Sequence, residues 1–429
     1  MDITSSQVEH RWRAEAHTPA AGRFLAATAL LPLAVGYFLS YLFRNVNGVV
    51  AGDIMRDLGI GADALGVLTS AYFLTFAAAQ LPVGVLLDRY GPRHVQTGLL
   101  LCAAAGAGLC AVNSGFIGLL LGRALIGLGT AGGLVAGLKA SAQWFPRERL
   151  TMVNGAFIMC GGLGALAATW PVEFLLRVVD WRGLSAVLAV AACTVALAIR
   201  VVIPGQQQAP AQMEKGMRLR DVIRDPMFYR FAPLSASCFG TVLAVQGLWA
   251  GPWLADVDGL SRTEVASGLA CMAVALIVAA PCWGLLTQRL RQHVKLTHVA
   301  ACAALVLITA ETLILARTRL PSVLPWCIFA LFGGMSVLSY SVLTDHFPAS
   351  AIGRANGVLN VLHIGCSFAM QLGVGQVIAL WPPIAGRYPA QAYQAGLLFP
   401  MAVQAMALLW FAWPRYSRRV RAARLGGHA

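Results

Sequence analysis

The chain has 429 residues, of which 58% are hydrophobic and only 12% are charged. A soluble globular domain carries about 25% charged residues, so this composition excludes a large soluble domain and indicates a membrane protein. The net charge of +14 is compatible with binding to nucleic acid or to anionic lipid, and the positions of the basic residues distinguish the two.

Apolar stretches long enough to cross a bilayer recur along the whole chain. A helix needs about 20 residues to cross a hydrocarbon core of ~30 Å, and we find twelve such stretches, centred near residues 36, 75, 104, 129, 163, 192, 241, 274, 306, 332, 367 and 404. Their even spacing and their abundant Gly and Ala favour helices over the alternating strands of a β-barrel. The sequence therefore predicts an all-α membrane protein with twelve transmembrane helices.

One long polar interruption divides the twelve stretches into two sets of six. We predict a cytoplasmic N-terminal tail, a six-helix bundle, a cytoplasmic linker, a second six-helix bundle and a basic cytoplasmic tail, at residues 1–23, 24–203, 204–229, 230–414 and 415–429.

Short motifs repeat between the two halves, which indicates two pseudo-symmetric bundles. Gly84 and Arg89 of a polar loop correspond to Gly284 and Arg289 at one offset. The runs Trp144-Phe145-Pro146 and His346-Phe347-Pro348 correspond at an offset of 202, and Gly48, Ala51, Gly52 and Asp57 correspond to Gly247, Ala250, Gly251 and Asp256 at an offset of 199. Parallel repeats of this kind are a plan of secondary transporters, with substrate bound near the midplane between them.

The loop from Gly84 to Arg93 resembles the loop motif GxxxD(R/K)xG(R/K) of the major facilitator superfamily, with the last basic residue delayed by Pro92. The run Arg123-Ala-Leu-Ile-Gly127 in the fourth stretch is similar to the RxxxG motif of the same family. This resemblance covers nearly the whole chain and implies a carrier that works by alternating access.

Basic residues lie unevenly about the apolar stretches. Of the 32 Lys and Arg, 22 fall in the tails and alternate loops of one side, 7 fall on the other side, and Arg44, Arg123 and Lys139 lie within the stretches. The positive-inside rule then places both termini in the cytoplasm of a bacterial-type inner membrane. The charge is read as a topology signal and not as a nucleic-acid site, and the tail arginines can contact anionic lipid.

Arg44 is the strongest candidate for a substrate contact, because a charge inside a span is expensive and marks function. A guanidinium suits a carboxylate or phosphate, and the surrounding sequence resembles the first span of organic-anion and organophosphate carriers, although Phe43 stands where many of them have an Asp. The alternative is a structural pair with a carboxylate such as Asp53. Further candidates that could line the same site are Tyr37, Tyr41, Asn45, Gln246, Trp249 and Tyr340.

Candidates for proton coupling are Arg123, Asp53, Glu311 and His363, with Glu173 as a second carboxylate near the outer side. The family resemblance leaves proton coupling and helix packing open for Arg123. Glu311 and His363 have helix packing as their alternative, and Lys139 is expected to extend its ammonium toward the cytoplasmic mouth.

The polar loop is predicted to act as a cytoplasmic gate. By the family resemblance, Gly84, Asp88, Arg89, Gly91, Arg93 and the repeat residue Arg289 form a latch that closes this side. Gln288 replaces the acid in the second half, so the second latch should be weaker.

We predict a secondary active transporter, proton-coupled and importing a small organic anion. The fifth stretch lacks the Gly-Pro pair that would resemble the antiporter motif of drug exporters, and this difference favours uptake. The alternatives are a proton-driven exporter of drugs or metabolites and a transport-inactive membrane sensor. No nucleophile, nucleotide-binding loop or metal-ligand cluster is recognisable, and the ten cysteines lie scattered in apolar stretches, so neither an enzyme nor a cofactor or metal is expected. A monomer is expected.

Overall fold

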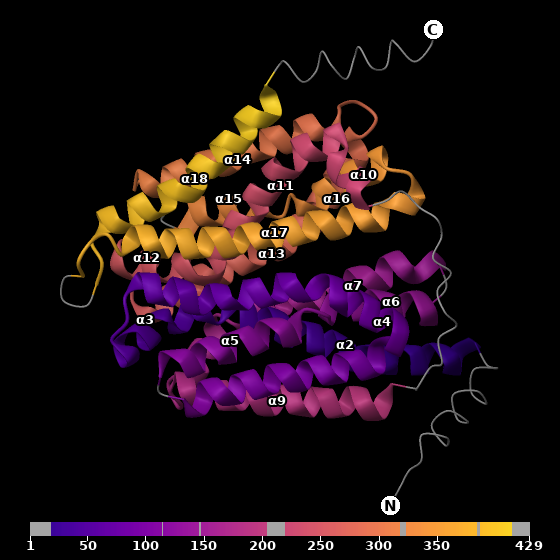
Figure 1. Ribbon diagram of the computed structural model, residues 1–429, viewed down its shortest axis with the longest axis horizontal. Helices are drawn as coiled ribbons and strands as arrows, with labels where there is room; N and C mark the ends of the chain where they lie inside the picture. Colours follow the sequence, from indigo (N-terminus) through magenta and orange to yellow (C-terminus); the bar gives the residue numbers. More distant parts are fainter. Residues whose placement is uncertain are drawn as a thin grey trace, which may run out of the picture.

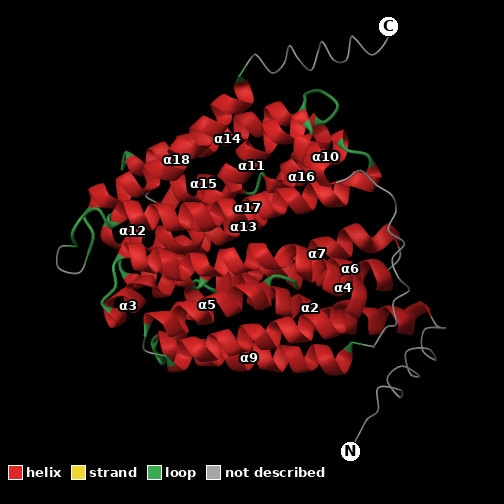
Figure 2. Cartoon of the chain, viewed as in Figure 1, coloured by secondary structure: helices red, strands yellow, loops and turns green. Residues whose placement is uncertain are grey.

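The computed structural model of the protein describes residues 19–113, 115–145, 147–203, 219–317, 323–383 and 387–413. Within these ranges the chain forms helices joined by short loops, and none of the described residues lies in a strand (Figure 2). The prediction of an all-α membrane protein is confirmed.

The helices fall into two bundles that follow the two halves of the sequence (Figure 1). The first bundle contains α2 (Pro19–Asn45), α3 (Asn47–Leu58), α4 (Ala62–Val112), α5 (Phe116–Thr130), α6 (Gly133–Trp144), α7 (Arg147–Ala167), α8 (Trp170–Leu175) and α9 (Trp181–Val202). The second half contains α10 (Leu219–Arg224), α11 (Pro226–Ala244), the π-helix η1 (Val245–Trp249), α12 (Ala250–Asp256), α13 (Arg262–Leu290), α14 (Leu296–Leu315), α15 (Val323–Gly333), α16 (Ser336–His346), α17 (Ala349–Ile378) and α18 (Ala390–Ala412).

The count of membrane spans agrees closely with the twelve apolar stretches. In the described residues, ten helical segments are long and apolar enough to cross a membrane, and the bent pair Thr28–Asn45 and Asn47–Leu58 supplies an eleventh. The remaining expected span corresponds to α7, whose apolar part, Val153–Ala167, is shorter.

The helix boundaries refine the predicted domain limits. Helix α10 lies inside the expected linker 204–229, and the expected start of the second bundle at residue 230 falls within α11. The rest of the linker, residues 204–218, and the end regions 1–18 and 414–429 lie outside the described residues.

Breaks in the spans follow the sequence repeat. The first span bends by 47° at Val46, and the seventh carries the π-helix from Val245, at the offset of 199 found in the sequence. The fourth span breaks between α5 and α6 at Gly132, and the tenth breaks between α15 and α16 at Gly334, at the offset of 202. Each half therefore repeats the same interruptions of its helices.

The polar loop expected from Gly84 to Arg93 is mostly helical, and a kink at Gly91 separates the two helices that make up α4. Helix α4 holds two spans, Ala62–Gln80 and Pro82–Val112, and its backbone leaves the helical region only at Gly91, with φ 75° and ψ 167°. Residues with a Cβ rarely adopt this φ, so glycine permits the sharp turn. Pro92 follows the break, where a first helical turn tolerates its missing N–H.

The two bundles touch backbone to backbone at the end of the molecule that holds α3 and α12, which we call the α3 end; the opposite end, which holds α10, is the α10 end (Figure 1). A Cβ on Gly251 would collide with the carbonyl oxygen of Gly48, and a Cβ on Gly375 would lie 2.6 Å from the carbonyl oxygen of Ala62. Small residues permit this close approach. The α3 end is therefore tightly packed between the bundles.

Candidate functional site

Arg44 lies in the last turn of α2, immediately before the bend of the first span. Its side chain is buried, with 7% of its surface exposed, and its guanidinium carbon lies 4.8 Å from the ring centre of Tyr41, 5.0 Å from that of Phe76 and 5.9 Å from that of Tyr72. Its Nε donates to the hydroxyl of Tyr72 over 3.4 Å. The arrangement is an aromatic cage around a buried cation.

No carboxylate among the described residues forms an ion pair with Arg44. Asp53 instead pairs with Arg262 and Arg56, so the alternative of a structural Arg44–Asp53 pair is wrong. A buried cation normally has an anionic partner. The guanidinium of Arg44 is therefore available to bind an anionic group that is not one of the described carboxylates.

Tyr72 and Phe76, one helical turn apart on α4, were not singled out by the sequence, although their spacing places both on one face of a helix. The Tyr72 hydroxyl accepts a hydrogen bond from Thr130 Oγ1 over 3.0 Å, and its ring stacks on Phe76 at 5.8 Å. These contacts hold the cage in place from α4 and α5.

Tyr41 lies beside Arg44, and Tyr37 packs against Tyr41. Tyr37 packs edge-on against Tyr41 at 5.1 Å and stacks on Phe157 of α7 at 5.2 Å. Tyr340 of α16 packs edge-on against the ring of His363 of α17 at 6.1 Å. The phenols of Tyr37 and Tyr41 supply hydroxyl groups that can bind oxygen atoms of a ligand.

The other predicted substrate contacts have different surroundings. Asn45 donates from Nδ2 to the carbonyl oxygen of Tyr41 over 2.8 Å, and Trp249 donates from its indole to the carbonyl oxygen of Gln371 over 3.2 Å. Gln246 is buried in η1, whose backbone packs against Gly48 of the first span. Asn45 and Trp249 are thus engaged within their own bundles.

His363 and Glu311 make contacts that stay inside the second bundle. His363 shares a hydrogen bond of 2.8 Å between Nε2 and Ser235 Oγ. Glu311 on α14 accepts one of 2.7 Å from Gln404 Nε2 on α18. The structure does not bring either residue to the cage around Arg44.

Arg123 lies on α5 with 7% of its surface exposed. It lines a cavity of about 20 Å³ together with Phe43, Cys110 and Trp181. Among the described residues, no hydrogen-bond or ion-pair partner of its guanidinium is found, so its burial is not explained by a contact within the protein.

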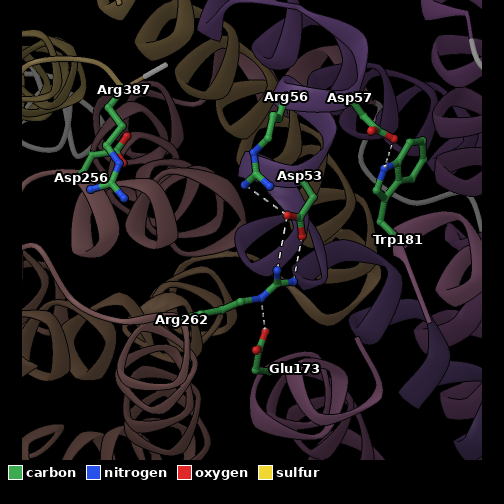
Figure 3. A network of polar contacts seen from close by, with 8 residues as sticks. All are labelled: Asp53, Arg56, Asp57, Glu173, Trp181, Asp256, Arg262 and Arg387. Carbon is green, nitrogen blue, oxygen red and sulfur yellow. Dashed lines mark hydrogen bonds and ion pairs between the residues drawn. The ribbon is translucent and has the colours of Figure 1, made fainter. Parts of the chain in front are cut away.

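At the α3 end, Arg262 of α13 joins the two bundles (Figure 3). Its Nη2 lies 2.8 Å from Asp53 Oδ2 on α3, and its Nε lies 2.7 Å from Glu173 Oε2 on α8. Arg56 lies 3.5 Å from Asp53 and is mostly exposed. We call these four residues the α3-end ionic cluster; the sequence had marked its two carboxylates but not Arg262.

At the α10 end, the predicted gate residues contact groups of their own bundle. Asp88 Oδ1 lies 2.7 Å from Lys139 Nζ, which also donates to the carbonyl oxygen of Leu87 over 2.8 Å. Arg93 donates from Nε to the carbonyl oxygen of Arg200 over 3.0 Å. The expected extension of Lys139 toward this mouth therefore ends in an ion pair with the gate acid.

The remaining gate residues surround this pair. Gly84 is half-buried with no atom near the position of a Cβ, and Gly91 forms the kink. Arg89 is exposed and lies over the ring of Tyr90, and Arg289 of the second half is exposed. In the second half Arg291 pairs with Asp345 of α16 instead.

Two repeated helical bundles with broken central helices define a membrane transporter of the two-bundle type. The family model of the Major Facilitator Superfamily matches residues 33–370, and the chain belongs to this family.

Curated relatives match parts of the chain. A hexuronate transporter of Escherichia coli (strain K12) is 28% identical over 148 residues, 34% of each chain, so the match spans about a third of that relative's length. A probable nitrate/nitrite transporter, NarK2, of Mycobacterium tuberculosis (strain ATCC 25618 / H37Rv) is 26% identical over 272 residues, 61% of this chain and 67% of the relative.

Among solved structures, a bacterial homolog of the human lysosomal transporter Spinster, in an inward-facing and unoccupied conformation, aligns with a TM-score of 0.76. The alignment covers 90% of this chain and 96% of that chain at 17% identity. At this identity the likeness shows the fold alone.

Proposed function

We propose that this protein is a secondary transporter of a small organic anion and that Arg44 binds the anionic group of the substrate. The observation that carries the proposal is the buried guanidinium in its aromatic cage, which has no carboxylate partner among the described residues. A carboxylate is a favourable ligand for a guanidinium because two oxygens match its fork of N–H donors.

The relatives support an anionic cargo. A hexuronate and a nitrate differ in size but share a delocalised negative charge on oxygen atoms. Tyr41 beside Arg44 and the neighbouring Tyr37 favour the larger of the two, because their hydroxyls can bind the hydroxyls of a sugar acid.

We place the α10 end in the cytoplasm of a bacterial-type inner membrane, with both termini on that side, because 22 of the 32 Lys and Arg belong to this side of the topology. The α3 end then faces outward, where glycine contacts and the α3-end ionic cluster hold the bundles together. Uptake requires this end to open by a rocking of the two bundles while the Asp88–Lys139 side is closed.

The proposal includes symport with protons. The carboxylates at the bundle interface are Asp53 and Glu173, which share Arg262. Protonation of either would weaken the link between the bundles and so couple external protons to opening.

Uptake into proteoliposomes tests the proposal. Glucuronate and galacturonate should be taken up, glucose should not, and a protonophore should abolish accumulation. The variant Arg44→Gln should raise KM by about 30-fold, since a hydrogen bond to a charged group contributes about 2 kcal/mol. Arg56→Gln, which removes a mostly exposed cation, is the matched control.

Uptake by Arg44→Gln with an unchanged KM would remove Arg44 from the substrate site. Uptake of nitrate without any sugar acid would reassign the cargo to an inorganic anion. Accumulation that persists with the protonophore would exclude proton symport.

A further inference from the structure

The cavity beside Arg123 lies inside the first bundle, away from the interface between bundles. Residues of the first span, α3, α4, α5 and α9 line it, among them Phe43, Val50, Ala107, Leu188, Cys110 and Ser185. Its volume of about 20 Å³ exceeds the roughly 10–15 Å³ that one water molecule needs. The cavity therefore has room for one species somewhat larger than a water molecule, such as a halide ion, and is too small for an organic substrate.

The charge in this bundle is unbalanced. Among the described residues, the buried charged side chains of the first bundle are Arg44, Arg123 and Glu173, and Glu173 is bound to Arg262 of the other bundle. Two buried guanidinium groups thus remain without a carboxylate. An unpaired buried charge is strongly unfavourable, so a counter-ion at Arg123 would stabilise the bundle.

We propose that Arg123 and this cavity form a binding site for a small monovalent inorganic anion such as chloride. The walls are mostly apolar, and Ser185 already donates its hydroxyl proton to the carbonyl oxygen of Trp181 over 2.9 Å. A site with one cationic donor and apolar walls replaces few of an anion's hydrogen bonds to water, so the free-energy cost of desolvation is lowest for a weakly hydrated anion. Chloride and bromide are therefore favoured over fluoride and sulfate.

This site is separate from the Arg44 cage. Phe43 and Arg44 are consecutive in a helix and so project about 100° apart, and Phe43 lines the Arg123 cavity while Arg44 faces Tyr41 and Phe76. The inference does not depend on which substrate the protein carries.

Thermal unfolding of the full-length protein in detergent tests the site, with tryptophan fluorescence as the readout and no transport substrate present. Sodium chloride or bromide, compared with sodium gluconate at equal ionic strength, should raise Tm saturably, by about 1.5 °C at ten times the dissociation constant. Arg123→Gln should abolish the difference between halide and gluconate, and Arg44→Gln should retain it.

Ala107→Val keeps the guanidinium but narrows the cavity, and it should also abolish the halide effect. This variant decides the question if Arg123→Gln fails to fold. Equal Tm in halide and gluconate, or a halide effect that survives in Ala107→Val, would overturn the proposal. So would a halide effect that disappears in Arg44→Gln alone, because it would place the ion at the substrate cage.

Discussion

Arg262 offers the most direct test of how the bundles are held together. It is the residue of the α3-end ionic cluster that belongs to the second bundle, and its guanidinium reaches Asp53 and Glu173 of the first. The variant Arg262→Gln removes both ion pairs but keeps a side chain of similar length. We expect the α3 end to open more often in this variant.

The magnitude follows from the exposure of the partners. The Glu173 side chain is 5% exposed and that of Asp53 is 20% exposed, whereas that of Arg262 is 46% exposed. Exposed pairs contribute about 0.2–1 kcal/mol, and breaking a fully buried pair costs about 3–5 kcal/mol. A value of about 2 kcal/mol for this half-buried cluster would shift the ratio of open to closed molecules by about 30-fold.

Hydrogen exchange measured by mass spectrometry reports this shift without added labels. Peptides that cover α3 and the start of α13 should exchange up to about 30-fold faster in Arg262→Gln, since exchange there follows the population of the open state. Arg56→Gln removes a cation that also contacts Asp53 but is 80% exposed, and it should change exchange little. Equal exchange in Arg262→Gln and in the unmodified protein would refute a locking role for the cluster.

Two further predictions concern the packing and the gate. Gly251→Ala should prevent full closure of the α3 end at a cost of about 1–3 kcal/mol, because its methyl group would collide with the backbone of Gly48. Faster hydrogen exchange in α12 would show this effect, and an unchanged exchange rate would contradict it. Asp88→Asn and Lys139→Gln should slow uptake to a similar extent, because each breaks the same ion pair of 2.7 Å, whereas Gln288→Asn should leave uptake nearly unchanged; a larger loss in Gln288→Asn would contradict the asymmetry of the two halves.

The fold was predictable because its signals are local in the sequence. The length of apolar stretches determines the spans, and short motifs at fixed offsets reveal the repeat. Arg44 was also predictable, because a charge within an apolar stretch stands out against its neighbours. The structure adds what those signals do not contain, namely which side chains of other helices surround it.

The partners of the charged residues were harder to predict, since they depend on how helices pack. Tyr72 and Phe76 join Arg44 from another helix, and Arg262 reaches Asp53 from the other bundle. The Arg44–Asp53 pair fails for the same reason, because Asp53 is bound by Arg262 and Arg56 beyond the 47° bend of the first span.

The charged pairs at the α10 end show how far the repeat extends. In the first bundle the acid Asp88 lies on α4 and the base Lys139 on α6, whereas in the second the base Arg291 follows α13 and the acid Asp345 lies on α16. The same elements are joined with the charges reversed. Both halves therefore retain an ion pair between corresponding helices. The second half has such a pair although Gln288 replaces the acid.

The broken first and seventh spans are also equivalent in the two halves. The bend at Val46 and the π-helix from Val245 occupy equivalent positions, and η1 packs on the bend through Gly48. Only the first bundle places an arginine beside its break, since the position equivalent to Arg44 is Leu243. Duplication thus supplies two matching hinges, and the anion specificity that we propose comes from the side chain that the halves do not share.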